Sequence, residues 1–493
     1  MLNYRSTRGG DKGTSASKAI VQGLAKDGGL FVPETMPKMT RSLASLKEMT
    51  YQDLAYEVMS KFYEDFTEEE LRACINQAYD SKFDTREIAP TVKVGNDYFL
   101  ELFHGATIAF KDMALSILPY LMMTAAKKIG IENKIVILTA TSGDTGKAAL
   151  AGFADVEGTG IVVFYPKDGV SPIQKKQMVT QVGDNTHVVG IEGNFDDAQS
   201  SVKEMFLDDK LREELASQGY QFSSANSINI GRLIPQVVYY YYTYLTLLKQ
   251  GEIKEGEVIN VSVPTGNFGN ILAAYYAKSM GLPIGKLICA SNDNKVLFDF
   301  MSTGVYDKDR SFILTSSPSM DILISSNLER LIYEIADDQE HQTKALMAEL
   351  MASGQYTITP SMTNRLSGFY GNYANQDETA DAIKKVFEKD GYLMDPHTAV
   401  GYKVMEKYRE ATKDQTKTVV ISTASPYKFT RSTMTALDEA YSKASDFDLI
   451  KDMHQVSNVT IPKAIHDILE APVRHKSICQ IEGMVEEVKD FLK

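Results

Sequence analysis

One lysine stands where its charge would be costly to bury. Lys111 directly follows the apolar residues Ile108 to Phe110, within the stretch LFHGATIAFKDMALS. A lysine at the start of a helix usually extends its amine to water along its aliphatic stem. A lysine that is held out of water has a lowered pKa instead, and its neutral amine can attack a carbonyl group to form an imine. Both interpretations of Lys111 are open at this point.

A glycine-rich turn follows a predicted strand, VINVSV, further along the chain. The turn reads PTGNFGN, Pro264 to Asn270, and a predicted helix, ILAAYYAKSMG, follows at once. Gly266 and Gly269 let the backbone approach a ligand closely, and the helix start directs free N–H groups and its positive dipole end to the same point. The pattern favours a phosphate site, although a plain strand-to-helix turn has the same composition. The dinucleotide spacing G-x-G-x-x-G is absent.

Two more loops of small polar residues follow predicted strands. TSGDTGK, Thr141 to Lys147, resembles a P-loop, but a threonine stands where that motif needs a glycine, which disfavours ATP binding. Its N–H groups suit a carboxylate or a phosphate; the alternative is a helix start capped by Asp144 or Thr145. STASPYK, Ser422 to Lys428, follows the strand TVVI and offers hydroxyl groups.

These features together predict a cofactor. In open α/β sheets, ligands bind beyond the carboxyl ends of the strands, where the three loops would meet. A reactive amine, a phosphate cradle and a hydroxyl group for a ring nitrogen are what pyridoxal 5′-phosphate needs from a protein. We expect no metal site, because the cysteines (Cys74, Cys289 and Cys479) are widely spaced and match no zinc pattern.

The elements that carry these loops alternate between strand and helix. KIVILTA (134–140) and TGIVVFYP (159–166) are each followed by a helical pattern, THVVGIEG (186–193) is a third strand, and a second series begins at VINVSV. This alternation predicts an α/β fold with two doubly wound parallel-sheet domains. The expected division is a mainly helical N-terminal domain (1–90), a smaller α/β domain (91–245) and a larger one (246–493) with an insertion around 300–390.

Two helical patterns are specific enough to test. Thr67 and Glu70 have the spacing of a capping box before the helix ELRACINQA. The run VVYYYYTYLTLL, Val237 to Leu248, predicts a half-buried helix whose phenol groups reach polar partners or water. Base stacking on these tyrosines is disfavoured because basic residues are missing from the run.

Composition excludes several classes of partner. A net charge of -13 repels phosphate backbones, so we expect no nucleic acid partner. No run of about 18 apolar residues indicates a membrane span, and the N-terminus has no secretory apolar core. We expect a cytoplasmic protein, either a monomer or a homodimer.

The motifs also resemble a known family. HGATIAFKDMA is similar to the lysine motif of threonine synthases, H-G-P-T-x-A-F-K-D. ATSGDTG, NSINIGRLIPQ, PTGNFGN and SSNLER follow in the family's order, and the resemblance extends from YRSTRGG to STASPYKF. Ala106 departs from the family's proline but removes no functional group. The resemblance implies pyridoxal phosphate enzymes of fold type II.

The resemblance assigns the cofactor contacts. Lys111 would form the imine with the cofactor, and Thr423, with Ser422 as the alternative, would face the pyridine nitrogen. The cofactor phosphate would be held by Gly266, Asn267, Phe268, Gly269 and Asn270.

It also assigns the substrate contacts. The substrate carboxylate would be held by Thr141, Ser142, Gly143, Asp144 and Thr145. Asn327 and Arg330 would bind the substrate phosphate, with help from Ser325 and Ser326. Three further residues have less defined roles: His104 orients Lys111 or the phosphate or is an ordinary loop histidine, Asp112 is an acid at a helix start, and His397 is structural or near the site.

The implied reaction is that of a carbon–oxygen lyase acting on phosphates. O-phospho-L-homoserine and water would give L-threonine and phosphate, with Lys111 taking a proton from Cα and later serving Cβ. One alternative is a serine/threonine dehydratase or a cysteine-synthase-like enzyme; these usually carry asparagine where Asp144 stands and lack SSNLER. Another is a non-catalytic protein that binds a phosphate ligand, which retention of Lys111 disfavours.

Overall fold

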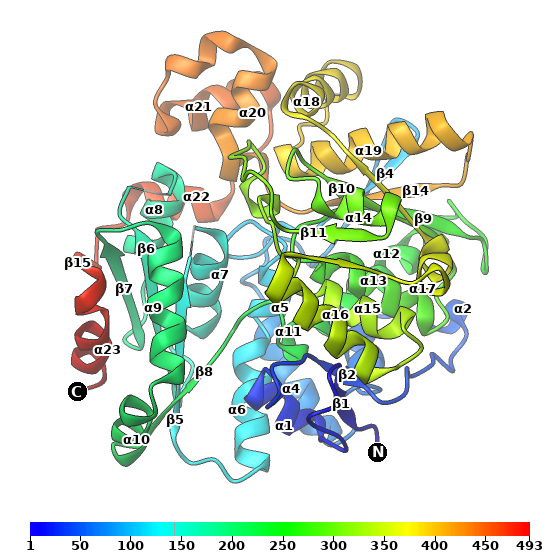
Figure 1. The fold of residues 1–493 in the computed structure, drawn as a ribbon. Helices are drawn as coiled ribbons and strands as arrows, with labels where there is room; N and C mark the ends of the chain where they lie inside the picture. Colours follow the sequence, from blue (N-terminus) through cyan, green and yellow to red (C-terminus); the bar gives the residue numbers. More distant parts are fainter. Residues whose placement is uncertain (142, 169) are drawn as a thin grey trace.

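Two α/β units lie side by side, and a helical N-terminal segment packs beneath the larger one (Figure 1). The computed structural model describes residues 1–141, 143–168 and 170–493, and it leaves out the side chains of Phe195 and Asp196. α5 (Asp112–Leu115), which directly follows Lys111, lies between the two units. In the described ranges, no helix is long and apolar enough to cross a membrane.

The N-terminal segment is mainly helical, as predicted. Thr67 and Glu70 form both hydrogen bonds of the capping box. α2 and α3 are separate helices, because the Thr50 side chain caps a new helix start. The elements are β1 (Tyr4–Ser6), α1 (Ala16–Gln22), β2 (Phe31–Pro33), α2 (Leu43–Leu46), α3 (Tyr51–Met59) and α4 (Glu68–Ala78).

The smaller unit contains a parallel sheet of strand order β15-β7-β6-β5-β8. Its central strands β5 and β6 are rich in buried apolar residues because both faces of the sheet are covered. Ile135 and Ile137 pack in one core with α6 and α7, whereas Val136 and Leu138 pack in another with α9, α10 and α23. The strands are β5 (Lys134–Ala140), β6 (Thr159–Pro166), β7 (Thr186–Ile191), β8 (Tyr220–Ser223) and β15 (Ser477–Cys479); the helices are α6 (Leu118–Lys128), α7 (Asp144–Phe153), α8 (Pro172–Val179), α9 (Phe195–Leu207), α10 (Asp209–Ser217) and α23 (Met484–Leu492).

The larger unit has a six-stranded sheet of order β13-β10-β9-β14-β4-β3, with only β3 antiparallel. Val419 and Ile421 pack on the face that α12 and α13 cover, and Val420 packs on the opposite face. The strands are β3 (Thr91–Val94), β4 (Asp97–Glu101), β9 (Ile259–Pro264), β10 (Ile284–Ser291), β13 (Phe369–Tyr373) and β14 (Thr418–Ser422); the helices are α11 (Ile230–Leu233), α12 (Pro235–Lys249), α13 (Gly269–Ser279), α14 (Val296–Thr303), α18 (Gln376–Asp390) and α19 (Pro396–Thr412).

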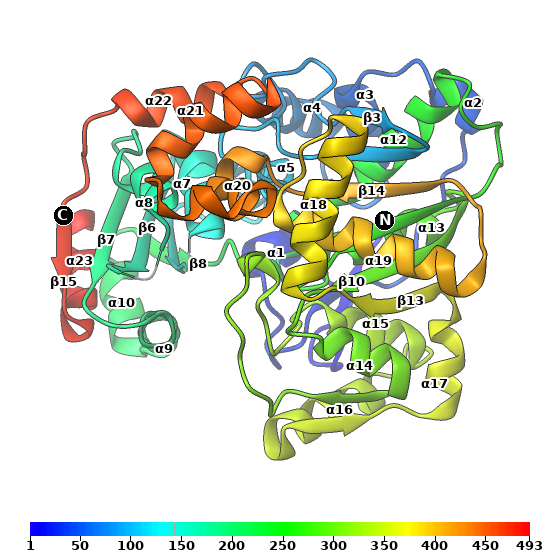
Figure 2. The same cartoon turned by 90° about the horizontal axis from the view of Figure 1, so that it is seen from above.

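The irregular region expected around 300–390 lies at the outer edge of the larger unit (Figure 2). It contributes β13 to the sheet and carries a small antiparallel pair of its own, β11 with β12. The strands of this pair are β11 (Val305–Asp307) and β12 (Gln355–Thr357). The helices of the region are η1 (Pro318–Met320), α15 (Leu328–Ile335), α16 (Glu340–Ser353) and α17 (Pro360–Arg365).

The division of the chain between the sheets differs from the expected boundaries. β3 and β4, expected in the smaller domain, belong to the larger sheet: β4 pairs with β14, and β3 pairs with β4 at the sheet edge. At the other end, α20 (Thr430–Leu437), α21 (Asp446–Ser457) and α22 (Lys463–Glu470) cross between the units, and β15 then pairs with β7 of the smaller sheet. Strand patterns do not reveal which sheet a short edge strand joins, because that choice depends on pairing between residues far apart in sequence.

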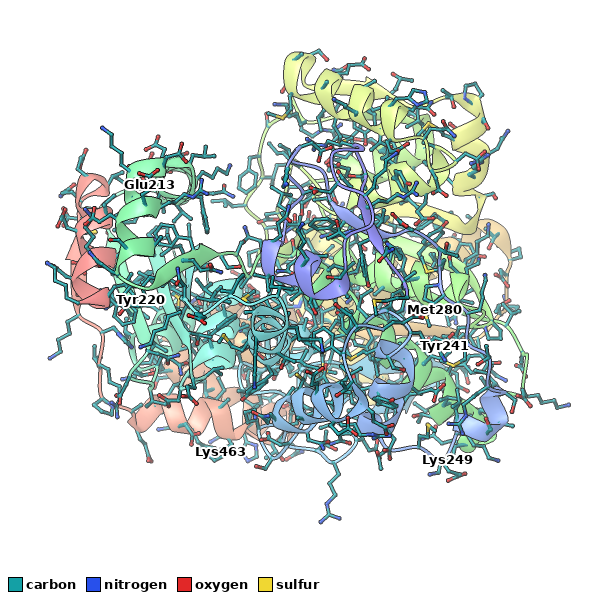
Figure 3. All side chains as sticks on the ribbon, turned by 90° about the horizontal axis from the view of Figure 1, so that it is seen from below. Glu213, Tyr220, Tyr241, Lys249, Met280 and Lys463 are labelled. Carbon is teal, nitrogen blue, oxygen red and sulfur yellow. The ribbon has the colours of Figure 1, made fainter. Side chains whose placement is uncertain are left out.

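The tyrosine-rich helix α12 is more deeply buried than predicted. Tyr239, Tyr240, Tyr241 and Tyr244 are all nearly inaccessible to solvent. Seen from below, α12, marked by the labelled Tyr241 and Lys249, belongs to the larger unit, whereas Tyr220 marks the smaller one (Figure 3). The hydroxyls of Tyr239, Tyr240 and Tyr244 therefore bond to groups inside the protein instead of water.

Candidate active site

The loop that carries Lys111 is fastened to the loop after β14. Phe110 N–H donates to the Thr423 carbonyl (2.8 Å), and Ser425 N–H donates to the Ile108 carbonyl (3.0 Å). Ile108 has φ 53°, a left-handed conformation that is unfavourable for a β-branched residue. Such strain is typical of functional loops that the surrounding structure fixes. One of the three predicted loops, STASPYK, therefore meets the segment that carries Lys111.

Asp112 contributes to the same loop without facing the site. Its carboxylate accepts the N–H (2.8 Å) and the hydroxyl (2.6 Å) of Thr107. A Cβ atom on residue 105 would overlap the Asp112 side chain, so Gly105 is needed there. Asp112 is the first residue of α5, as the predicted helix-start acid, and it shapes the loop.

The Lys111 amine does not extend to water. Its Nζ lies 3.3 Å from Ser319 Oγ and 3.5 Å from Asp144 Oδ2, and 11% of the side chain is exposed. Burial lowers the pKa of Lys111; Asp144 opposes this shift, and the positive charges of Lys428 and Arg232 lower the pKa further. The amine is thus disposed to lose its proton, as the chemical interpretation of Lys111 requires.

Asp144 lies between two lysines. Its Oδ1 is 3.2 Å from the fully buried Lys428 Nζ and accepts from Gln174 Nε2 (2.9 Å), and its Oδ2 accepts from Ser319 Oγ (2.7 Å). Burial alone would raise the pKa of this carboxyl, but Lys428 and Lys111 hold it well below its usual range. Asp144 is therefore ionised and unsuited to act as a general base. It is not a helix cap either, contrary to one alternative, because α7 has no side-chain cap bond at its start.

The rest of the TSGDTG loop is organised by a threonine. Thr141 Oγ1 accepts the N–H groups of Gly143 (2.9 Å) and Gly146 (3.0 Å). Thr145 is the second residue of α7, and Ser142 lies outside the described residues. The start of α7 is thus fixed beside Asp144, at the edge of the smaller sheet.

Ser319, from the irregular region of the larger unit, joins the two units at the site. Besides Asp144 and Lys111, it contacts His397, because the Ser319 N–H donates to His397 Nε2 (3.1 Å). His397 Nδ1 in turn lies 2.6 Å from Asp395, so this ring nitrogen carries the hydrogen. His397 is thus near the site, as one interpretation held, and it acts on Ser319.

The predicted anion loop adopts a tight turn next to Ser319. Phe268 has φ 65°, and α13 begins at the next residue. A Cβ atom on Gly266 would lie 2.7 Å from the Ser319 carbonyl oxygen, so only glycine fits there. The turn therefore presents the start of α13 to the region that Ser319 shares with Lys111.

Asn327 and Arg330 support this turn instead of facing a ligand. Both side chains are fully buried. Asn327 donates to the Asn267 carbonyl (3.0 Å) through its backbone N–H and again through Nδ2. Arg330 donates to the carbonyls of Phe31 (2.9 Å) and Ile228 (2.6 Å) and to Asn327 Oδ1. These contacts do not support the expectation that the two side chains bind the substrate phosphate.

Their neighbouring serines have similar tasks. Ser325 Oγ donates to the Gly266 carbonyl (2.6 Å), and Ser326 Oγ lies 3.4 Å from Ser227 Oγ. Ser325 thus supports the anion loop together with Asn327, whereas Ser326 contacts the segment before α11.

Asn270 has a side chain that fits a phosphate ligand. Its Oδ1 accepts the hydroxyls of Tyr239 (2.7 Å) and Tyr240 (2.6 Å). Its Nδ2 is buried and has no hydrogen-bond partner in the described part of the chain. A buried donor without an acceptor, next to a helix start and within one site with a buried amine, suits the phosphate and the carbonyl carbon of pyridoxal phosphate.

The structure distinguishes the two hydroxyl groups after β14. Ser422 Oγ contacts Thr398 Oγ1 (3.1 Å) and Tyr392 OH (3.4 Å). The Thr423 hydroxyl has no such partner among residues that the structure describes, and its carbonyl receives the Phe110 N–H. Thr423 is thus the one with a hydroxyl available to a ligand.

Sequence reasoning missed three residues of this site: Lys428, Ser319 and Arg232. Arg232, on α11 between α5 and α13, is 4% exposed and donates to the Ala225 carbonyl (2.8 Å), while its Nε has no partner within the described ranges. Burial lowers its pKa to about 10. Lys428 lies within STASPYK and Arg232 within NSINIGRLIPQ. The apolar residues next to each of them in the sequence indicate that these charged side chains are buried.

His104 is bonded to two carboxylates and has no hydrogen bond to Lys111 among the described residues. Its Nδ1 lies 2.6 Å from Asp84 and its Nε2 lies 2.9 Å from Glu101. Burial opposes protonation, but the two carboxylates raise the pKa of His104 to about 9. It joins the chain before β3 to the end of β4 and orients neither Lys111 nor an anion.

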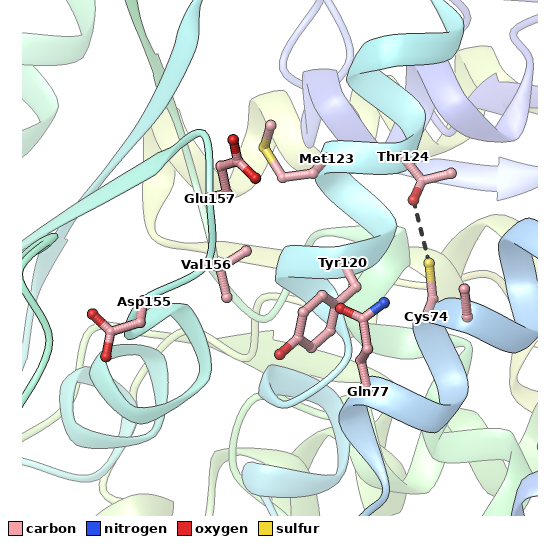
Figure 4. A pocket seen from close by; sticks show the side chains of 9 residues that line it. Cys74, Gln77, Tyr120, Met123, Thr124, Asp155, Val156 and Glu157 are labelled. Atoms are coloured by element: carbon pink, nitrogen blue, oxygen red, sulfur yellow. Dashed lines mark hydrogen bonds between the residues drawn. The ribbon is translucent and has the colours of Figure 1, made fainter.

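A cavity of about 400 Å³ lies elsewhere, between the N-terminal segment and the smaller unit (Figure 4). Cys74 and Gln77 of α4, Tyr120 and Thr124 of α6, and the turn Asp155–Glu157 line it. It contains none of the predicted site residues. Cys74 Sγ contacts Thr124 Oγ1 (3.4 Å), and burial raises the pKa of the thiol to about 11, so this cysteine is not activated.

Comparison with known proteins places this geometry in a family. Three family models match the chain: "Threonine synthase N terminus" at residues 3–79, "Pyridoxal-phosphate dependent enzyme" at 89–424, and "Threonine synthase, C-terminal" at 398–492. The chain belongs to the threonine synthase family of pyridoxal-phosphate-dependent enzymes. The family models thus span the N-terminal segment, both units and the C-terminal helices.

Individual members of the threonine synthase family are similar over most of the chain. Threonine synthase of Schizosaccharomyces pombe is 37% identical over 479 residues, covering 91% of each chain. Threonine synthase-like 1 of Homo sapiens is 41% identical over 435 residues, covering 85% of this chain and 58% of that protein. A crystal structure of PLP-bound threonine synthase from Brucella melitensis has a TM-score of 0.88 at 35% identity, covering 100% of this chain and 99% of that chain.

Proposed function

We propose that this protein converts O-phospho-L-homoserine and water to L-threonine and phosphate. The observation that carries the proposal is the Lys111 amine, which is buried beside Asp144 and beside Ser319, the residue that also packs against Gly266 of the anion loop. The family membership and the match over nearly the full length of the Schizosaccharomyces pombe threonine synthase support it.

The cofactor contacts follow the sequence-based assignment. Pyridoxal phosphate, when bound, supplies an electron-withdrawing ring that stabilises negative charge on the substrate carbon. Lys111 would hold the cofactor, Gly266 to Asn270 its phosphate, and Thr423 its pyridine nitrogen. The free hydroxyl of Thr423 and the unpaired Nδ2 of Asn270 support these roles.

The substrate contacts need one revision. Backbone N–H groups at the start of α7, within 141–145, suit the substrate carboxylate, whereas the ionised Asp144 side chain would repel it. Arg232 takes the place of Asn327 and Arg330 as the ligand for the substrate phosphate, because it is a buried cation with an unpaired Nε near Lys111.

Proton transfer is the task of Lys111. Its lowered pKa allows the amine to accept a proton from substrate Cα and to return one. Asp144 stays ionised and accepts from Ser319, so it holds Lys111 in place without exchanging protons. Lys428 and Gln174 fix Asp144 from the other side.

The broader setting is part of the same proposal. We infer a cytoplasmic enzyme of fold type II that acts on a small molecule as a monomer or a homodimer. The dehydratase alternative lacks support from the comparisons, and Asp144, in place of asparagine, forms an ion pair that an asparagine could not form.

The test is phosphate release from O-phospho-L-homoserine by the protein reconstituted with pyridoxal phosphate, with threonine identified as the product. A protein that stays colourless with added cofactor would contradict the whole proposal. Visible absorbance without phosphate release would contradict only the substrate, and production of a 2-oxo acid from serine or threonine would favour the dehydratase.

Lys111→Ala should abolish turnover, by about 10³-fold or more, because the other buried amine beside Asp144, that of Lys428, is already bonded to Asp144 and to the Thr107 carbonyl. The melting temperature of the cofactor-free protein should remain close to that of the wild type. Lys127→Ala, which changes an exposed lysine on α6, is the matched control. Unchanged turnover in Lys111→Ala would remove the central residue of the proposal.

A further inference from the structure

The tyrosine run on α12 has no part in the proposed reaction, yet two of its hydroxyls meet at one atom of the site. Tyr239 and Tyr240 are almost completely buried, with ring centroids 4.9 Å apart. Both hydroxyls donate to Asn270 Oδ1, at 2.7 Å and 2.6 Å. Asn270 is the second residue of α13 and the last residue of the anion loop. The two tyrosines of α12 thus contact the last residue of the anion loop.

Two donors on one carbonyl oxygen fix the orientation of the amide. An asparagine side chain presents an oxygen that accepts and a nitrogen that donates, on opposite sides. Because the oxygen is held by both tyrosines, the nitrogen must face the other way. Asn270 Nδ2 is buried there and has no acceptor in the part of the chain that the structure describes. A buried N–H group without an acceptor destabilises the folded protein. The orientation of Asn270 Nδ2 therefore indicates that a ligand supplies the acceptor.

We propose that Tyr239 and Tyr240 are positioning residues that hold the Asn270 amide so that Nδ2 donates to the phosphate group of the cofactor. The inference rests on the proposed function in one respect, that the loop from Gly266 to Asn270 binds that phosphate. A phosphate fits better than the cofactor ring, since the first turn of α13 directs its own N–H groups and positive dipole end to the same place.

The two tyrosines are not equivalent. Tyr240 donates to Asn270 alone, whereas the Tyr239 hydroxyl also lies 3.1 Å from Gln236 Oε1 and shares its hydrogen between the two oxygens. Burial raises the pKa of both tyrosines well above the usual value, so both hydroxyls remain donors over the working pH range. Tyr240 should therefore contribute more to the orientation of Asn270 than Tyr239.

The chain offers a matched control on the same helix. Tyr241 is equally buried, but its hydroxyl has no hydrogen-bond partner among the described groups. Tyr239→Phe, Tyr240→Phe and the double variant remove the donors to Asn270. Tyr241→Phe makes the same chemical change without touching that contact. Any effect of a lost hydroxyl on packing or helix stability should be shared by all of these variants.

The experiment measures binding of pyridoxal phosphate, and of pyridoxal without phosphate, to each cofactor-free variant by visible absorbance. We expect the Kd for pyridoxal phosphate to rise about threefold in Tyr240→Phe, less in Tyr239→Phe and about tenfold or more in the double variant. Tyr241→Phe should bind like the wild type. Affinity for pyridoxal should stay constant throughout, because the lost contact concerns the phosphate.

A second set of variants separates positioning from a general structural effect. In an Asn270→Ala background, Tyr240→Phe should cause no further change in Kd, because the tyrosine acts only through Asn270. Additive losses in that background would overturn the proposal, and so would equal losses for pyridoxal or unchanged affinity in both single variants. If the wild-type protein itself binds no pyridoxal phosphate, the proposed function fails as well; if it binds and the tyrosine variants match it, only this inference fails.

Discussion

Asp144 carries a negative charge between two buried lysines, and that arrangement determines what the residue can do. Its carboxylate is paired with Lys428 at 3.2 Å and with Lys111 at 3.5 Å, and both lysines lower its pKa. A residue so far from its protonation range cannot exchange protons in a reaction at neutral pH. Its contribution is to balance two cations that would otherwise repel each other in a poorly solvated site.

Asp144→Asn should therefore leave two buried ammonium groups without a counter-charge. Breaking a buried pair in this way costs about 3 kcal/mol, and we expect turnover to fall at least tenfold because Lys111 loses its contact. In the wild type the folded-state pKa of Asp144 is depressed, so its contribution to stability is complete above about pH 4 and is lost as the pH falls below that.

Urea unfolding between pH 3 and pH 7 measures this effect. The wild type should lose more stability below pH 4 than Asp144→Asn does. Asp209→Asn, which changes an exposed aspartate on α10, provides the reference for a charge change at the surface. Parallel stability curves for Asp144→Asn and the wild type would show that the ion pairs contribute nothing.

Arg232 is a second single residue whose burial indicates a ligand. Burying its incompletely paired guanidinium destabilises the folded protein, and a bound anion would offset that cost. It is a buried guanidinium with one carbonyl contact, and its Nε is unpaired. Arg232→Met should weaken binding of O-phospho-L-homoserine and of inorganic phosphate by about tenfold or more, because a hydrogen-bonded charge is lost.

The stability of the cofactor-free protein should hold or rise in Arg232→Met, since an unpaired buried charge is replaced by an apolar side chain. Steady-state KM and phosphate inhibition constants give the measurement, with the exposed Arg86→Met as control. An unchanged phosphate inhibition constant would assign the substrate phosphate to other groups.

At the scale of elements, the start of α15 acts as a support for the anion loop. Asn327 donates twice to the Asn267 carbonyl and accepts from Arg330 of the same helix, so the start of α15 is tied to one peptide group of the turn. Asn327→Ala should raise the Kd for pyridoxal phosphate by about tenfold, because the turn loses the contacts that hold its shape.

The same variant separates support from substrate binding. At saturating cofactor, its KM for O-phospho-L-homoserine should stay within about twofold of the wild type. Asn364→Ala on α17, at an exposed position, serves as control. A large rise in KM with unchanged cofactor affinity would restore Asn327 as a ligand of the substrate phosphate.

The elements themselves were predictable, because each depends on local pattern. The strands at 134–140 and 159–166 match their predicted bounds, and Ser171 caps α8 as its sequence indicates. The lysine loop and the two glycine loops were also found from residue types alone. The roles of Asn327 and Arg330 were not, because a side chain's direction depends on Phe31 and Ile228, which are distant in sequence.

Ser319 is a site residue that the sequence did not reveal. It lies in a loop with no motif of its own, and it reaches the site only because the irregular region folds back to Gly266 and His397. Sequence spacing cannot predict such a contact. The assignment of β3, β4 and β15 to their sheets failed for the same reason, since pairing between distant segments decides it.

At the scale of the whole molecule, His104 joins two parts of the chain by charge. Asp84 lies in the segment that leaves the N-terminal helices, and Glu101 ends β4 of the larger sheet. The two carboxylates raise the pKa of His104 to about 9, so the imidazole is protonated between them at neutral pH. The N-terminal segment is thus attached to the larger unit by a contact that depends on pH.

The direction of that dependence follows from linkage. The folded-state pKa lies above the unfolded value of about 6.5, so protonated His104 stabilises the folded protein fully below pH 6.5. This contribution, at most about 3 kcal/mol because Asp84 is partly exposed, is lost as the pH rises toward 9. In His104→Gln, the free energy of unfolding should be lower at pH 6 and should vary less between pH 6.5 and pH 9. Urea unfolding across this range measures it, with the exposed His466→Gln as control; a wild-type slope retained in His104→Gln would place the pH dependence elsewhere in the molecule.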